Sequence, residues 1–190
     1  MPESNETKSK LLRASKTLFW KYGIKRVTVE EISEQAEVSK MTFYRHYKNK
    51  EAIAEAVLEQ VFNKSMRRYT KIMSSDDDFR VKVDAIVKLQ YDDAKGISEE
   101  FIVDILKKDN SPLHKKLEEL NQNSLQQVKK DFIEAQRKGE IRADLNIDFM
   151  MYMLNDLNTK LVDKQLIKYY NTEEALIMEL TNFFFYGILP

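Results

Sequence analysis

A short segment of this chain carries several side chains of the types that hydrogen-bond nucleic acids. They are Lys40, Thr42, Tyr44 and Arg45. Cationic and hydroxyl-bearing side chains bind phosphate oxygens and the edges of bases in the major groove. On a helix, these side chains point away from a small apolar core formed by Val38, Phe43 and Tyr47. The segment therefore has the chemistry and the spacing of a helix that reads DNA.

Two capping signals place this segment on the second of two short helices. Thr28 precedes an amphipathic run and Glu31 follows three residues later, which is the pattern of a capping box. Ser39 has the chemistry of the next N-cap. Two helices joined by so short a turn must cross steeply. The spacing predicts a helix-turn-helix over about residues 29–48.

A wider pattern surrounds these two helices and covers roughly residues 6–66. An earlier apolar-periodic helix ends at Gly23 and carries Leu11, Leu12, Ala14, Leu18, Phe19 and Tyr22. The Val38-Ser39 entry to the second short helix, its aromatic residues and the Lys48–Glu51 start of a long helix follow in order. Taken together, these segments resemble the TetR family of transcriptional regulators.

The resemblance implies an all-α fold with an N-terminal three-helix DNA-binding head, joined by a long helix to a C-terminal domain for ligand binding and dimerisation. We expect the head at 6–66 and the second domain at 67–190. The resemblance further implies a homodimeric repressor that leaves a palindromic operator on double-stranded DNA when a small-molecule effector binds. The sequence identifies neither the effector nor the sign of regulation.

The resemblance also assigns a DNA-contacting surface to the head. Its expected residues are Thr28, Ser39, Lys40, Met41, Thr42, Tyr44, Arg45, His46, Tyr47, Lys48 and Lys50. Arg45 is the strongest candidate for reading guanine. We expect Thr28, Tyr47, Lys48 and Lys50 to fix the phosphate backbone, because helix N-termini and lysines favour phosphate oxygens.

Two positions depart from the family pattern. Glu37 occupies the turn position that is most often glycine, and a positive φ at a residue other than glycine costs about 1 kcal/mol. Met41 also stands where glycine is common, at the start of the recognition helix. Its side chain either touches a thymine methyl group or holds the helix farther from the groove.

The remainder of the chain is predicted to be helical, giving about nine helices in all. No alternating pattern typical of strand hairpins occurs. The expected helices after the head are a long fourth one to 73, then 77–94, 98–108, 111–138, 148–170 and 172–187.

The charge distribution separates the two halves of the chain. The 190 residues have a formal net charge of zero, but residues 1–73 carry 15 Lys+Arg against 9 Asp+Glu. The remaining residues carry 16 against 22, so the half with the helix-turn-helix is basic. A basic head attracts phosphates, whereas an acidic body does not. A chance scatter of charges is the alternative. The absence of cysteine and of an apolar leader predicts a cytoplasmic protein without a membrane segment.

The last two predicted helices carry broad apolar stripes that we expect at a dimer interface. These residues are Leu154, Leu157, Leu161, Leu176, Leu180, Phe183 and Phe184. A helix that is apolar over most of its circumference must be buried. By resemblance, two such helices from each subunit form a four-helix bundle. The alternative is that both stripes belong to the core of one chain.

A ligand pocket is expected between the fifth and eighth predicted helices. Its candidate wall residues are Tyr91, Phe101, Ile105, Phe132, Met151, Tyr152 and Asn155. Methionine and aromatic side chains can line an adaptable apolar cavity. The same side chains can equally fill a core.

The sequence argues against an enzyme and against a metal site or cofactor. The two histidines, His46 and His114, have no ligand partner at helical or hairpin spacing. Four scattered glycines leave no phosphate-binding loop. The competing interpretation is a DNA-binding protein without a small-molecule switch, which is controlled by a protein partner or acts as an architectural factor.

Overall fold

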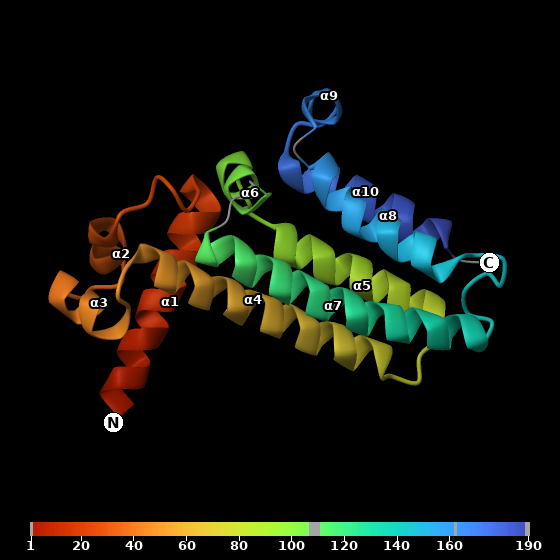
Figure 1. Cartoon of the computed structure of the whole chain (residues 1–190), viewed down its shortest axis with the longest axis horizontal. Helices are drawn as coiled ribbons and strands as arrows, with labels where there is room; N and C mark the ends of the chain where they lie inside the picture. Colours follow the sequence, from red (N-terminus) through yellow and green to blue (C-terminus); the bar gives the residue numbers. More distant parts are fainter. Residues whose placement is uncertain (1, 107–110, 162, 189–190) are drawn as a thin grey trace. The chain divides into compact units, whose positions relative to one another are not determined.

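The computed structural model describes residues 2–106, 111–161 and 163–188. All regular secondary structure within these residues is helical, which confirms the predicted all-α class (Figure 1). The helices are α1 (Pro2–Tyr22), α2 (Val29–Gln35), α3 (Lys40–His46), α4 (Lys50–Met73), α5 (Phe79–Ala94), α6 (Glu99–Leu106), α7 (Pro112–Arg137), α8 (Ile147–Lys160), α9 (Lys164–Ile167) and α10 (Glu173–Gly187).

The chain forms two compact units, and two long helices contribute to both. Unit 1 comprises Met1–Phe62 and Gly96–Glu119, and unit 2 comprises Asn63–Lys95 and Leu120–Pro190. Unit 1 therefore contains α1–α3, α6, the first part of α4 and the start of α7. The sequence-based division at residue 66 followed chain order and left 96–119 with the second domain.

Unit 1 has a core of buried apolar side chains from the helix-turn-helix, α1, α4 and α6. Its members include Leu11, Phe19, Trp20, Ile24, Val27, Ile32, Phe43, Ile53, Val57, Leu58 and Phe101. Three of these, Phe19, Ile32 and Phe43, are fully or almost fully buried. Burying a large apolar side chain contributes roughly 1.5–3 kcal/mol, so this core fixes α2 and α3 on α1.

Unit 2 has its own core, built on α4, α5, α7, α8 and α10. Its members include Tyr69, Phe79, Val83, Ile86, Leu89, Phe132, Met150, Met151, Phe184 and Phe185. Helix α10 packs against α5. The side chain of Gln136 donates to the carbonyls of Arg142 (3.0 Å) and Leu145 (2.8 Å), which fixes the connection from α7 to α8. No described helix is long and apolar enough to cross a membrane.

The predicted helix over 148–170 is wrong, because the structure divides this segment into α8 and α9. The described residues therefore contain ten helices rather than about nine. Asp163 has an extended backbone, and its carboxylate accepts the N–H of Gln165 at 2.8 Å. An aspartate in this conformation caps a new helix instead of continuing the previous one. The apolar spacing concealed this break.

Candidate DNA-binding site

Helix α2 begins with the capping box that the sequence predicted. The backbone N–H of Thr28 donates to the Glu31 carboxylate at 2.8 Å, and the N–H of Glu31 donates to Thr28 Oγ1 at 3.2 Å. Donation by the Thr28 N–H holds the pKa of Glu31 below its usual value. Two amides that a helix start leaves without partners are thus satisfied by side chains.

The turn between α2 and α3 contains a residue with positive φ. Glu37 has φ 57°, in the left-handed region that we expected at this position. The N–H of Glu37 donates to the Glu34 carbonyl (3.0 Å), and the N–H of Val38 donates to the Ser33 carbonyl (2.9 Å). These hydrogen bonds close the turn and offset the conformational cost of a side chain at Glu37.

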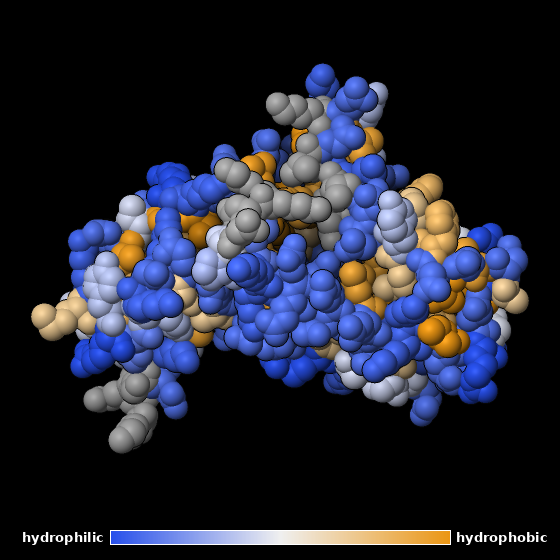
Figure 2. Space-filling model, viewed as in Figure 1, coloured by the Kyte–Doolittle hydropathy of each residue, from blue (hydrophilic) through white to orange (hydrophobic). Residues whose placement is uncertain are grey.

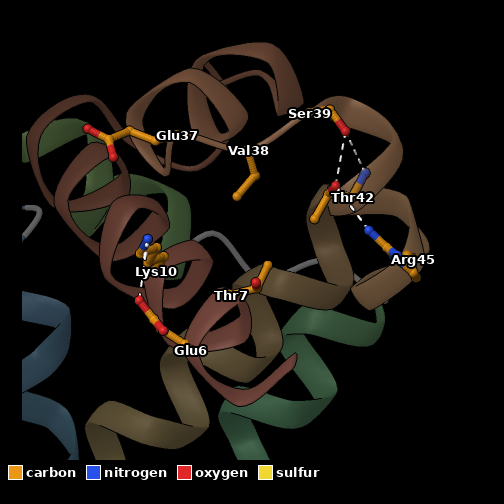
Figure 3. Close-up of a pocket in the computed structure, with 8 residues that line it drawn as sticks. All are labelled: Glu6, Thr7, Lys10, Glu37, Val38, Ser39, Thr42 and Arg45. Atoms are coloured by element: carbon orange, nitrogen blue, oxygen red, sulfur yellow. Dashed lines mark hydrogen bonds and ion pairs between the residues drawn. The ribbon is translucent and has the colours of Figure 1, made fainter. Parts of the chain in front are cut away.

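A relay of hydroxyl groups orients the recognition helix α3 and one of its cations. The Oγ of Ser39 accepts the N–H of Thr42 (3.1 Å) and lies 3.0 Å from Thr42 Oγ1. Arg45 Nη2 donates to the same Thr42 hydroxyl at 3.2 Å, as the dashed lines in Figure 3 show. The guanidinium is therefore partly ordered before any ligand binds, and it keeps free donors for a base or a phosphate.

The aromatic residues of α3 divide between the core and the surface. Phe43 is fully buried, whereas Tyr44 and Met41 are exposed. Tyr47 follows the helix and is also buried; its hydroxyl makes no hydrogen bond with the described residues, and burial raises its pKa. The structure thus places Tyr47 in the core of unit 1 rather than at the surface where a phosphate contact was expected.

Two lysines of the predicted surface have partners within the chain. Lys40 forms an ion pair with Glu30, and its ammonium holds the pKa of that carboxyl group below the usual value. Lys50 Nζ donates to the backbone carbonyl of Lys25 at 2.8 Å. Thr28, Ser39 and Lys48 are exposed.

An open groove of about 470 Å³ lies beside the recognition helix, within unit 1. It is lined by Glu6, Thr7, Lys10, Glu37, Val38, Ser39, Thr42 and Arg45 (Figure 3). Lys10 and Glu6 form an ion pair at 3.5 Å on its α1 side. Thr7 and Lys10 were not among the predicted residues, although both lie on the polar face of α1, and that amphipathic pattern was the available signal.

The predicted pocket residues do not share one environment. Phe101 and Ile105 belong to the core of unit 1, and Phe132 and Met151 belong to the core of unit 2. Tyr152 is exposed, as is Tyr91, and Asn155 accepts a hydrogen bond from the side chain of Asn121 at 3.0 Å. The pocket remains a prediction.

The residues predicted at the dimer interface differ in burial. Leu176 and Phe184 are buried within their own chain, and Leu154 and Leu157 pack partly buried against the core of unit 2. Leu161 and Leu180 are half-buried. Phe183 is 77% exposed. Three aromatic residues that were not predicted at the dimer interface, Phe149, Tyr152 and Tyr186, are exposed on α8 and α10 as well.

Comparison with known proteins agrees with this arrangement. The family described as "Bacterial regulatory proteins, tetR family" matches residues 11–57. The chain is 25% identical to the transcriptional regulator UidR of Escherichia coli over 157 residues, covering 82% of this chain and 79% of UidR. It is 23% identical to the transcriptional repressor KstR2 of Rhodococcus jostii, covering 78% and 74% of the two chains.

A solved structure extends the likeness of fold to both units. The regulator FadR of Bacillus subtilis, solved in complex with stearoyl-CoA, superposes with a TM-score of 0.71 at 18% identity. The match covers 95% of this chain and 98% of FadR. With a helix-turn-helix at the matched residues and a helical body of the same fold, the chain is similar to TetR-family transcriptional regulators over most of its length.

Proposed function

We propose that this protein is a homodimeric transcriptional repressor that binds a palindromic operator and leaves it when a small molecule binds to unit 2. The observation that carries the DNA-binding part is the relay from Ser39 through Thr42 to Arg45 on an exposed helix. It partly orders the guanidinium of Arg45, and a bidentate arginine is the commonest reader of guanine.

Among the other groups of unit 1, some are assigned to contacts with base edges and others to contacts with phosphates. Lys40, Thr42 and Tyr44 are assigned to the major groove of DNA together with Arg45. The N-terminal end of α2 at Thr28 and the lysines Lys48 and Lys50 bind the backbone, because amides at a helix start and ammonium groups both favour phosphate oxygens. Backbone contacts set the register, and base contacts set the sequence preference.

Dimerisation is assigned to the surface formed by α8 and α10. Large aromatic side chains reach solvent there, and Figure 2 shows apolar side chains at the surface of unit 2. The exposed aromatic residues of α8 and α10 are Phe149, Tyr152, Phe183 and Tyr186. A second copy of this surface would cover them, and two copies related by two-fold symmetry match a palindrome with two half-sites.

The small-molecule switch is assigned to the core of unit 2. Met66, Met73, Met150 and Met151 lie in or against this core, and methionine side chains adapt to inserted groups. FadR, which shares the fold, was solved with stearoyl-CoA. Helix α4 carries residues of both units, so a ligand that repacks its second half acts on the helix that also holds part of unit 1.

Selection from a randomised duplex library tests the DNA-binding proposal. The purified full chain is incubated with the library at moderate salt, and the bound pool is sequenced. An enriched palindrome supports a sequence-specific dimer. Binding that depends on salt without a consensus sequence supports an architectural factor instead and contradicts the proposal.

A regulator without a small-molecule switch is the second candidate function. The observation in its favour is that Phe132, Met151 and their neighbours are buried in the core of unit 2. A screen of small apolar compounds for release of the selected duplex separates the two candidates. Release by any compound that also raises the melting temperature of the free protein favours the switch.

A further inference from the structure

The turn that follows α1 is held by α6, which lies about eighty residues farther along the chain. Helix α6 packs on α1 (Figure 1), and the N–H of Ser98 donates to the Trp20 carbonyl at 2.9 Å. The rings of Trp20 and Phe101 lie with their centroids 4.2 Å apart. These contacts bring the start of α6 against the last turn of α1, where the chain turns toward the helix-turn-helix.

Asp104 uses both of its carboxylate oxygens on a single residue of this turn. Its Oδ2 accepts the backbone N–H of Lys25 at 2.9 Å, and its Oδ1 lies 3.1 Å from Lys25 Nζ. The Asp104 side chain is only 10% exposed. A largely desolvated carboxylate with two charge-assisted partners holds its donors more firmly than a surface ion pair does. Asp104 therefore fixes both the backbone and the side chain of Lys25.

The close approach of α6 requires a glycine in the turn. Gly23 has φ 79°, and a Cβ atom there would lie 2.9 Å from Asp104 Oδ2 and 3.0 Å from the Cβ of Glu100. Both the backbone conformation and the space exclude other residues. The sequence thus specifies the contact between this turn and α6 from both sides.

Lys25 in turn holds a residue of the proposed DNA surface. Its backbone carbonyl accepts a hydrogen bond from Lys50 Nζ at 2.8 Å. An ammonium has three donors, so Lys50 keeps donors for a phosphate while this one is occupied. Asp104, Lys25 and Lys50 form a continuous chain of contacts inside unit 1, from α6 to the start of α4.

We propose that Asp104 is a positioning residue for DNA binding, which acts by fixing Lys25 and, through it, the ammonium of Lys50. The DNA-binding unit of this chain then includes α6, although α6 lies outside the helix-turn-helix. The inference rests on the proposed function, because it requires that the head binds DNA.

The sign of the expected effect separates positioning from simple electrostatics. Removal of a carboxylate from a DNA-binding head should strengthen DNA binding if charge alone matters, because one repulsion with the phosphates is lost. Positioning by Asp104 predicts the opposite. Glu99 provides the matched control, since it is an exposed carboxylate on the same helix.

The experiment compares Asp104→Asn and Asp104→Ala with Glu99→Gln in the full chain, on the selected duplex. We expect Glu99→Gln to bind as wild type or slightly more tightly, Asp104→Asn to bind more weakly, and Asp104→Ala to bind roughly tenfold more weakly, as the loss of a charged hydrogen bond implies. Thermal unfolding of each variant shows that binding is measured on folded protein. Tighter binding by both Asp104 variants would overturn the proposal.

A double-mutant cycle tests the route through Lys50. If Asp104 acts by holding Lys50, Asp104→Ala adds little to the loss of DNA affinity that Lys50→Ala already causes. The salt dependence of DNA binding should then show the loss of the Lys50 phosphate contact in both single variants. Full additivity of the two losses would instead assign Asp104 a purely structural role and overturn the route. Folding defects common to both variants do not produce the non-additive pattern.

Hydrogen exchange of the free protein keeps the inference distinct from the proposed function. Asp104→Ala should accelerate exchange at the Lys25 amide, whereas Glu99→Gln should leave it unchanged. If wild type binds no duplex, the proposed function fails and the role in DNA binding fails with it, while the exchange result still decides whether Asp104 holds the turn. Unchanged exchange at Lys25 in Asp104→Ala would overturn the contact itself.

Discussion

On α3, the two exposed cations already have partners within the chain. Arg45 is held by Thr42, and Lys40 is paired with Glu30. On α8 and α10, the exposed side chains include large aromatic groups such as Phe183 that reach solvent. A surface prepared for a charged, hydrated ligand keeps its donors ordered at little cost, whereas an apolar surface gains stability only when another apolar surface covers it.

The difference indicates how each unit completes its task. In unit 1, two cations that are proposed to contact DNA, Lys40 and Arg45, are already held by partners within the chain. Unit 2 exposes a surface that, on the proposed function, a second copy covers. Changes to α3 should therefore alter which duplex is bound, and changes to α10 should alter how many chains bind it.

The largest effect is expected from truncation of the two cores. Phe43 and Phe132 are both fully buried, so Phe43→Ala and Phe132→Ala should each destabilise their unit by about 3–5 kcal/mol. The single tryptophan, Trp20, lies in the core of unit 1 and reports its unfolding by fluorescence, while circular dichroism reports all helices. In urea unfolding, Phe43→Ala should lower the midpoint of the fluorescence transition more than the midpoint of the circular dichroism transition. Equal shifts of both signals in both variants would mean that the units unfold as one.

A charge placed in the apolar surface of α10 should separate the proposed dimer. Phe183→Asp should weaken dimerisation by at least about 2 kcal/mol, the scale of an interface hot spot, and leave the melting temperature of the monomer nearly unchanged because the side chain is exposed. Sedimentation equilibrium measures the association. Val103→Asp places the same charge at an exposed apolar position of α6 and serves as the control. A dimer that survives Phe183→Asp would move the interface elsewhere.

The elements of the head that the sequence predicted correctly depend on local signals. Thr28, Glu31 and Ser39 bind amides within three residues of themselves, so the chain near each cap contains the information. The contribution of α6 to unit 1 has no such signal, because Asp104 meets Lys25 through a contact between distant segments. Spacing of apolar residues shows which positions are buried, but not which core receives them.

The same limit applies to residues whose type suits more than one environment. Phe101 and Phe132 were predicted to line one pocket because both are large and apolar, and the structure places each in the core of a different unit. Tyr47 could serve a surface or a core equally well by residue type, and its burial follows from contact with Phe43. The turn at Glu37 was recognisable because its backbone is set by its position between two helices, whatever residue occupies it.

Loss of the held guanidinium should change sequence preference more than general affinity. Arg45→Ala should cost roughly 1–3 kcal/mol on the selected duplex and little on random DNA, because a base contact is lost. Lys48→Ala is the comparison, since a lost phosphate contact should weaken both duplexes alike and reduce the salt dependence. Fluorescence anisotropy with the two duplexes measures all four affinities. Equal losses on both duplexes for Arg45→Ala would contradict its role as a reader.

The smallest effect is expected at the turn, where unit 1 tolerates a strained backbone. Glu37 has φ 57°, so Glu37→Gly should relieve about 1 kcal/mol of strain, less the entropy that glycine loses on folding. Glu34→Gly makes the same chemical change in the last turn of α2, where the backbone is helical, and should destabilise by about 1 kcal/mol. Urea unfolding followed by Trp20 fluorescence should therefore show shifts of opposite sign. Destabilisation of similar size in both variants would mean that the Glu37 side chain contributes more, beside the groove that it lines, than its backbone conformation costs.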